Sequence, residues 1–324
     1  ALVDMYAKCG MPTKAQEVLE ELLVRDVVSW SSLIGGYVQS GEPYEALNCF
    51  ERMQSEGLSP NAVTFSCILK VCGRTRSIEK GKQIHREILD KGFLEKEIVL
   101  SNALVDMYAK CGVLVKAQKL HEELRIRNVI SWSALIAGYA QQGHGYEALD
   151  CFKRMQTEGH SPDEVTFLCA LNACYHSGLL DEAEQLFQIM SREYGITPCI
   201  EHLTCMVVVF GSGKNFDAAL SVIKVTPSSN LPVVWVALLG ACRKWGNLKL
   251  GLLAFDQTIQ LDGSCAPAYV LMANIFASAG MQEDAKKVEL MKHKYTDWKN
   301  QPHSDWVDSS ANIRSLSVGD TKHL

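Results

Sequence analysis

The sequence predicts an all-α protein, a right-handed α-solenoid in which helix-turn-helix repeats stack side by side. The first observation behind this fold class is exact self-similarity, because residues 1–10 return unchanged as residues 103–112. The same shift aligns Val27–Asn61 with Val129–Asp163, where 23 of 35 positions are identical. The second observation is that each block holds two stretches of helical periodicity. Self-similarity at a fixed period indicates stacked units rather than one globular core.

The segment Val27–Asn61 shows the plan of one repeat. Its first helix is marked by apolar residues at helical spacing, namely Leu33, Ile34, Tyr37 and Val38. Gly41 ends this helix, and Pro43 suits the first turn of the next one. The second helix carries the stripe Ala46, Leu47, Phe50 and Met53, and it ends at Gly57.

The other segments follow the same plan at altered length. We predict a partial short repeat at 1–26, full repeats at 27–61 and 129–163, long repeats at 62–97 and 164–199, short repeats at 98–128 and, degenerate, at 200–231, and weaker helix pairs at 232–292. Residue Ala1 falls inside a repeat, so we expect the chain to be a piece of a longer protein.

Composition sets limits on function. The chain has 324 residues, 47% hydrophobic and 21% charged residues and a net charge of −5. This is the composition of a folded protein, and the charge counts mildly against nucleic-acid binding without excluding it. The twelve cysteines include no C-x-x-C pair, which favours buried free thiols in a reducing compartment. No apolar run is long enough to span a bilayer, so we expect no membrane partner.

Particular motifs resemble the pentatricopeptide repeat family, in its plant-organelle subclass with alternating long and short repeats. Residues Val27-Val28-Ser29-Trp30-Ser31 match the motif of the full repeat, and residues 102–112, NALVDMYAKCG, match the motif of the short repeat. Segment 232–292 resembles the tetratricopeptide-like extension that follows such arrays. Residues 293–324 look like the degenerate start of the family's cytidine deaminase domain, with His303 where the family has glycine.

The resemblance implies recognition of single-stranded RNA, with about one base read per repeat. In the family, the second residue of a repeat packs against base faces, which places Val28, Val63, Val99, Ile130 and Val165 there, whereas Glu201 departs from the pattern. The fifth and last residues of a repeat read the base edge, and these pairs are Ser31 with Asn61, Asn102 with Asn128, Ser133 with Asp163, and Thr204 with Asn230. The resemblance implies that these four pairs favour, in the same order, adenine, a pyrimidine, guanine and adenine.

Two other interpretations of these residues stay open. Asn and Asp at repeat junctions are also ordinary helix N-caps and turn residues. Trp30 and Trp132 could stack on bases, but their apolar neighbours favour a place in the core between repeats.

Motifs for catalysis are incomplete. A zinc deaminase needs H-x-E followed by P-C-x-x-C, but no C-x-x-C follows His85-Arg86-Glu87 or His121-Glu122-Glu123. We therefore expect no metal, no cofactor, no small-molecule substrate and no enzyme activity. Gly211-Ser212-Gly213-Lys214 lacks the spacing of a phosphate loop and is predicted to be the turn between two helices.

The resemblance thus implies a specificity factor for RNA modification in a mitochondrion or chloroplast, chiefly C-to-U editing. A deaminase or another editing protein would dock through 232–292. One alternative is a tetratricopeptide-like scaffold that binds proteins, which the negative charge favours. Another is a cytidine deaminase in a longer form of the protein.

Overall fold

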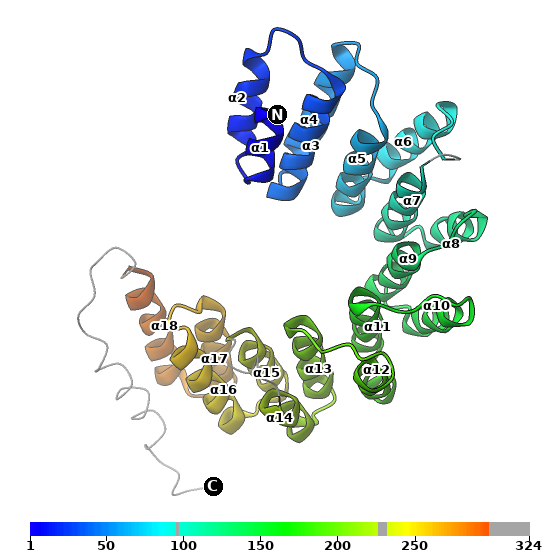
Figure 1. Cartoon of the computed structure of the whole chain (residues 1–324). Coiled ribbons are helices and arrows are strands. Elements are labelled where there is room, and N and C mark those ends of the chain that lie inside the picture. The colour runs from blue at the N-terminus through cyan, green and yellow to red at the C-terminus, as the bar shows by residue number, and fades with distance from the viewer. Residues whose placement is uncertain (95–96, 226–231, 298–324) are drawn as a thin grey trace, which may run out of the picture. The chain divides into compact units, whose positions relative to one another are not determined.

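The computed structural model describes residues 1–94, 97–225 and 232–297, and every regular element within these ranges is an α-helix. The chain divides into two compact units, residues 1–177 and residues 178–324, which are described separately. The predicted fold class, an all-α solenoid of helix-turn-helix repeats, is confirmed in each unit (Figure 1). The expected features of residues 298–324 and of Asn230 lie outside the described ranges.

The first unit contains eleven helices within its described residues. In chain order they are α1 (Leu2–Lys8), α2 (Pro12–Glu21), α3 (Val27–Ser40), α4 (Pro43–Ser55), α5 (Ala62–Thr75), α6 (Ile78–Asp90), α7 (Ile98–Lys110), α8 (Leu114–Glu123), α9 (Val129–Gln141), α10 (Gly145–Thr157) and α11 (Glu164–Ser177). Each of the predicted ranges 27–61, 62–97, 98–128 and 129–163 holds two of these helices, a first and a second.

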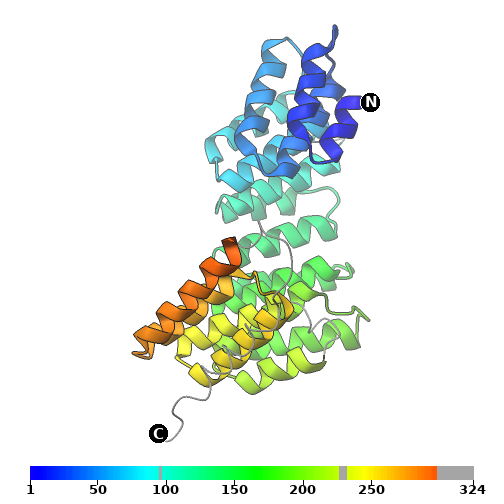
Figure 2. The ribbon, with the colours of Figure 1, turned by 90° about the vertical axis from the view of Figure 1, so that its left-hand side faces the viewer.

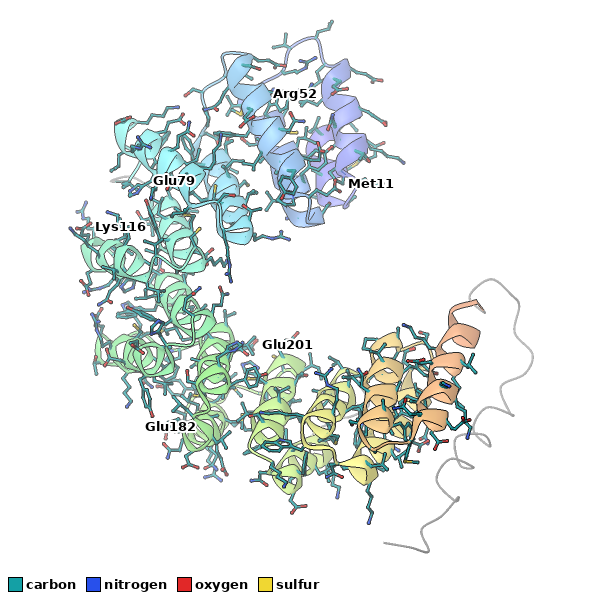
Figure 3. All side chains as sticks on the ribbon, turned by 180° about the vertical axis from the view of Figure 1, so that it is seen from behind. Met11, Arg52, Glu79, Lys116, Glu182 and Glu201 are labelled. Carbon is teal, nitrogen blue, oxygen red and sulfur yellow. The ribbon has the colours of Figure 1, made fainter. Side chains whose placement is uncertain are left out.

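The first helices of successive repeats pack against one another and form one layer of the unit. The contacts run from α1 to α3, α5, α7, α9 and α11, and each second helix packs beside the first helix of its own repeat. Figure 1 shows α5, α7, α9 and α11 on one side and α6, α8 and α10 on the other. Figure 3 labels Arg52, Glu79 and Lys116 on this second-helix layer.

The core lies between the two layers, where the repeated apolar residues meet. Trp30 and Trp132 are completely buried there, as expected, and so are Phe65 and Phe167 at the same place in the long repeats. Cys49, Cys72 and Cys151 are buried free thiols, as predicted, whereas Cys9 is exposed because it lies in the turn after α1. Burial raises the pKa of Cys151 to about 12, so this thiol stays protonated.

The second unit continues the same arrangement with seven helices in its described part. They are α12 (Leu180–Arg192), α13 (Ile200–Ser212), α14 (Phe216–Val225), α15 (Pro232–Trp245), α16 (Leu248–Leu261), α17 (Ala266–Ser278) and α18 (Gln282–Asp297). Again α13, α15 and α17 pack in sequence, and α14, α16 and α18 each pack on the helix before them. Figure 2 shows the yellow and orange helices, α16 to α18, side by side within this unit.

One local prediction needs correction. Gly211 and Ser212 are the last two residues of α13 and not part of the turn, which begins at Gly213. The reason is packing, because a Cβ atom on Gly211 would lie 2.4 Å from the Cβ atom of Ala241. A glycine in the helix therefore allows α13 and α15 to approach closely, and the turn itself uses Lys214 with a positive φ of 63°.

Candidate nucleic-acid interface

A row of exposed aliphatic side chains marks the first-helix layer. The second residue of five consecutive first helices is Val28, Val63, Val99, Ile130 or Val165, with exposed fractions between 59% and 66%. Single exposed aliphatic residues are common on proteins, but recurrence at one position of five consecutive repeats is not expected by chance. In the second unit α13 carries the exposed Glu201 at this position, labelled in Figure 3, and α15 carries Val233.

Between Val28 and Val63 in the sequence lies the first polar pair. Asn61 is the N-cap of α5, and its Oδ1 accepts hydrogen bonds from the backbone N–H and the hydroxyl of Thr64, both at 2.9 Å. Ser31 on α3 is buried, and its hydroxyl lies 2.6 Å from Thr64 Oγ1 and 3.5 Å from Asn61 Oδ1. The structure therefore brings Ser31 and Asn61 together, although they are thirty residues apart in the sequence.

In the second polar pair the two side chains are joined directly by one hydrogen bond. Asn102 Nδ2 on α7 donates to Oδ1 of Asn128 at 3.3 Å, and that oxygen also caps α9 through the N–H of Ser131 at 2.9 Å. Asn102 is only 7% exposed, and its Oδ1 has no hydrogen-bond partner among the described residues. A buried acceptor without a partner is unfavourable, so this amide oxygen is a costly feature of the interior at this junction.

At the third junction a threonine joins the pair. Asp163 Oδ1 accepts from the N–H and the hydroxyl of Thr166 at 2.8 and 2.7 Å, and Ser133 Oγ lies 2.8 Å from the same hydroxyl. The Asp163 side chain is exposed, and its second oxygen has no partner among the described residues. This leaves one carboxylate oxygen able to accept hydrogen bonds from outside.

The cap interpretation and the binding interpretation of these residues are compatible. Asn61, Asn128 and Asp163 each cap a helix through one oxygen, and this hydrogen bond fixes the orientation of the rest of the side chain. The residues that hold them were not predicted from the sequence, and they are Thr64, Ser131 and Thr166. Their signal was present as a Ser or Thr three residues after each Asn or Asp, the pattern of a capping box.

The remaining expected positions are less regular. Thr204 on α13 donates its hydroxyl hydrogen to the Ile200 carbonyl at 2.8 Å, and its expected partner Asn230 lies outside the described residues. At the cap before α13 the Cys199 thiol lies 2.7 Å from His202 Nδ1. The structure therefore does not bring a polar reading pair together at this repeat within its described part.

Cations near the ends of the first helices are partly engaged by the protein. Lys110 pairs with Asp106 on α7 at 2.7 Å, and Arg74 on α5 donates to the Val38 carbonyl at the end of α3 at 2.9 Å. Lys244 on α15 reaches the Ser212 carbonyl at 3.4 Å in the same way. Positive side chains here satisfy helix C-termini of the preceding repeat, which leaves less charge for an outside anion.

The histidines of the two H-x-E triplets lie in the core. His85 Nδ1 is 3.0 Å from the Tyr108 hydroxyl, and His121 packs edge-on against Trp132 with ring centroids 4.2 Å apart. Within the described ranges no group of three His, Cys, Asp or Glu residues could hold a metal ion. None of the described helices is both long and apolar enough to cross a membrane.

Comparison with known proteins identifies the repeats. Residues 25–74 and 127–176 match a family model described as the PPR repeat family, and residues 1–27, 63–93, 99–129 and 165–194 match the PPR repeat model. Together these matches extend over more than half of the chain.

Curated relatives come from Arabidopsis thaliana. The chloroplastic pentatricopeptide repeat-containing protein CRR2 is 40% identical over 296 residues, which are 90% of this chain and 45% of CRR2. A mitochondrial pentatricopeptide repeat-containing protein is 34% identical over all of this chain and 51% of its own length. The chain thus spans about half the length of these relatives.

Among solved structures, PPR10 in complex with an 18-nucleotide psaJ RNA element superimposes with a TM-score of 0.70. The two are 17% identical, and the match covers 91% of this chain and 45% of PPR10, so the likeness shows the shared fold. From its repeats, its helical layers and these matches, this chain belongs to the pentatricopeptide repeat family.

Proposed function

We propose that this chain binds single-stranded RNA and reads its bases along the first-helix layer. The observation that carries the proposal is the recurrence of one arrangement at three repeat junctions. Each has a polar pair joined by hydrogen bonds, directly or, for Ser133 and Asp163, through Thr166, and lies between first helices that carry an exposed aliphatic second residue, while the polar residues differ from junction to junction. A base inserted between two aliphatic side chains would bury apolar surface on both faces, whichever base it is. The polar pair would then supply the selectivity.

The groups left free at each junction indicate which base fits. At Asn61 and Asn128 the capping oxygen is engaged, and the amide Nδ2 remains to donate to an acceptor such as adenine N1 or the N3 of cytosine. At Asp163 the free carboxylate oxygen is acceptor-only, which suits the ring N–H and amino group of guanine. The family's preferences, together with Thr204 and Asn230 for a further adenine, give the RNA core A-x-pyrimidine-G-x-A.

The wider role follows from the relatives. Those named as chloroplastic or mitochondrial support an organellar place for this protein, without deciding between the two. We propose that the chain acts as a specificity factor for RNA processing, including C-to-U editing, and does not itself catalyse a reaction. A deaminase or another editing protein would be recruited, with the helix pairs α15 to α18 as the docking segment.

A direct binding measurement tests the proposal. The chain is titrated into labelled RNA that contains A-x-C-G-x-A and, separately, into a scrambled sequence of equal composition, at 50 and 200 mM salt. We expect at least tenfold tighter binding to the designed sequence at both salt concentrations, because the base contacts survive when the phosphate contacts are screened. Equal affinity for the two RNAs would show that the first-helix layer does not read bases.

A further inference from the structure

The short repeat lacks a ring that the neighbouring repeats have. The fourth residue of α3, α5, α9 and α11 is Trp30, Phe65, Trp132 or Phe167, each completely buried between the two layers. In α7 the fourth residue is Ser101. The second helix of this repeat, α8, is also shorter, with 10 residues where α4, α6 and α10 have 13.

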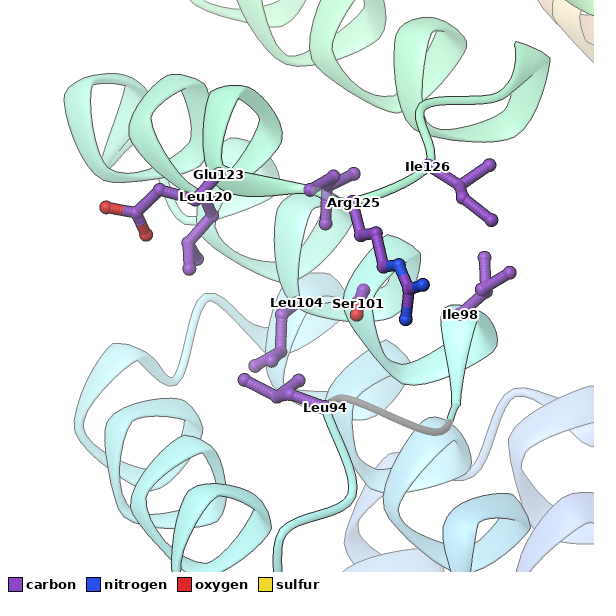
Figure 4. Close-up of a pocket in the computed structure, with 9 residues that line it drawn as sticks. Leu94, Ile98, Ser101, Leu104, Leu120, Glu123, Arg125 and Ile126 are labelled. Carbon is purple, nitrogen blue, oxygen red and sulfur yellow. The ribbon is translucent and has the colours of Figure 1, made fainter.

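A cavity of about 650 Å³ opens at this place (Figure 4). Its wall is mostly aliphatic and consists chiefly of Leu94, Ile98, Ser101, Leu104, Leu120 and Ile126. Ile98 and Ile126 are exposed at its rim. The volume lies in the range of small-molecule pockets, so the missing ring and the missing helical turn have left a site that a single large side chain can enter.

The surroundings of the equivalent rings show what chemistry fits. A cation lies over each of three of them, with Arg52 at 5.4 Å from the Trp30 centroid, Lys91 at 5.3 Å from Phe65 and Arg154 at 5.6 Å from Trp132. Such cations stabilise an aromatic face electrostatically.

The cation at the cavity comes from a different position of the repeat. The tenth residue of the second helix, Arg52 in α4 and Arg154 in α10, is Glu123 in α8. Figure 4 shows the Glu123 carboxylate pointing away from Ser101, whereas Arg125 extends toward Ser101 and Ile98. A guanidinium at the wall of the cavity can lie against an aromatic face and can also pair with a carboxylate.

We propose that this cavity binds a Trp or Phe side chain of a partner protein, presented by a segment with carboxylates beside the ring. The ring would occupy the place that Trp30 and Trp132 fill in their own repeats, and the carboxylates would pair with Arg125. A nucleobase fits less well, because the mostly aliphatic wall would leave the polar edge of the base without partners. The wall residues of the cavity are not among the residues proposed above to contact RNA, although Ser101 precedes Asn102 in α7.

The test uses the full chain and a fluorescein-labelled peptide with the central sequence Asp-Asp-Trp-Asp-Asp. We expect the same peptide with Ala in place of Trp to bind at least tenfold more weakly. Ser101→Trp places the missing ring in the cavity, and it should weaken binding of the Trp peptide at least tenfold without lowering the melting temperature. Ser55→Trp adds the same ring at an exposed position of α4 and should leave the affinity unchanged. Equal binding of the Trp and Ala peptides, or undiminished binding by Ser101→Trp, would overturn the proposal.

A charge exchange tests the same site in a variant that leaves the core untouched. Arg125→Glu should weaken the Asp-flanked peptide at least tenfold and strengthen a Lys-flanked Trp peptide. If both peptides bind the variant as they bind the original chain, the carboxylates do not meet Arg125 and the proposal is wrong. Displacement of the Trp peptide by adenosine monophosphate at lower concentration than by indole would assign the cavity to a nucleotide instead.

Discussion

At the scale of single residues, His121 is the least satisfied group in the described core. Its side chain is 1% exposed, and neither ring nitrogen has a hydrogen-bond partner among the described residues. Burial, with smaller contributions from Arg127 and Arg154, lowers the pKa of His121 to about 4. The neutral ring is therefore favoured in the folded chain, while an unfolded histidine keeps its ordinary pKa near 6.5.

This difference predicts how folding stability depends on pH. Above pH 6.5 both states carry a neutral His121, so its contribution is constant there. As the pH falls from 6.5 toward 4 the unfolded state takes up a proton that the folded state does not, and stability is lost. Between pH 8 and pH 5 we expect a loss of about 2 kcal/mol from this group.

His121→Leu should remove that loss, since the equivalent residue of the preceding short repeat is the buried Leu19. Urea unfolding at pH 8 and pH 5 measures the free energy of unfolding of both proteins. The Leu variant should lose about 2 kcal/mol less than the original chain over this interval. An identical loss in the two proteins would show that His121 does not titrate differently on unfolding.

The sequence predicted single positions unevenly. The five aliphatic residues at the second helix position and the three junction residues could be chosen in advance, because the family motif fixes their register. The hydrogen bonds through Thr64 and Thr166 could not, because they join side chains of different repeats and depend on how α3 meets α5 and α9 meets α11. The consequences of Ser101 also depend on the neighbouring repeats and were missed.

At the scale of helices, close approach between first helices depends on glycine. A Cβ atom on Gly36 of α3 would lie 2.8 Å from the Cβ atom and 3.1 Å from the Cα atom of Ala7 in α1. The next residue toward the N-terminus, Gly35, would meet only Cys67 Sγ, at 3.9 Å. Two adjacent glycines of one helix therefore differ in whether an added methyl group has space.

We predict opposite effects of alanine at these two positions. Gly36→Ala should destabilise the chain by about 1–3 kcal/mol, because α1 and α3 must move apart. Gly35→Ala should be neutral or stabilising by up to about 1 kcal/mol, because alanine favours the helix. Thermal and denaturant unfolding of the two variants measures both values. Equal destabilisation by the two variants would mean that the close contact between α1 and α3 is not the reason for glycine at position 36.

The ends of helices were predicted well where a glycine in the left-handed conformation follows the helix. Gly41 adopts the left-handed conformation at the end of α3, with φ of 82°, as the pattern indicated. The end of α13 was predicted less well, because Gly211 signals a turn in the sequence although its role is to let α15 approach. Glycine has both uses, and only the neighbouring helix decides between them.

At the scale of the whole molecule, we predict that replacing the exposed aliphatic residues of the first helices changes RNA affinity but hardly changes the free energy of unfolding. Val99 and Ile130 flank the pair Asn102 and Asn128 in sequence and are largely exposed, so replacing both with serine should change the free energy of unfolding by less than about 1 kcal/mol. The same double variant should weaken RNA binding about 5- to 30-fold, because apolar burial against a base is lost.

Val115→Ser is the matched control, because Val115 is exposed on the second-helix layer, in α8. It should change neither the RNA affinity, measured by gel shift, nor the free energy of unfolding, measured with denaturant. If Val115→Ser lost as much RNA affinity as the double variant, the claim that the exposed aliphatic residues of the first helices contact the RNA would be contradicted.

The net charge of −5 counts mildly against a nucleic-acid ligand, and the cations of the first helices bear on the same question. Lys110 and Arg74 already interact with Asp106 and with the end of α3, so the charges of these two side chains are less available to phosphates. The fold class could be predicted from the repetition of the sequence and its helical periodicity, whereas the hydrogen bond between Asn102 and Asn128 depends on the packing of neighbouring repeats.

One measurement decides whether the junction pairs read bases. The affinity of the chain and of Asp163→Asn is compared on two RNAs that differ only at the fourth place, A-x-C-G-x-A and A-x-C-A-x-A. Asn keeps the capping acceptor but replaces the free carboxylate oxygen by a donor, so the original chain should prefer guanine and the variant adenine, each by about tenfold. An unchanged preference in the variant, with stability preserved, would contradict base reading by Asp163 and with it the proposed register.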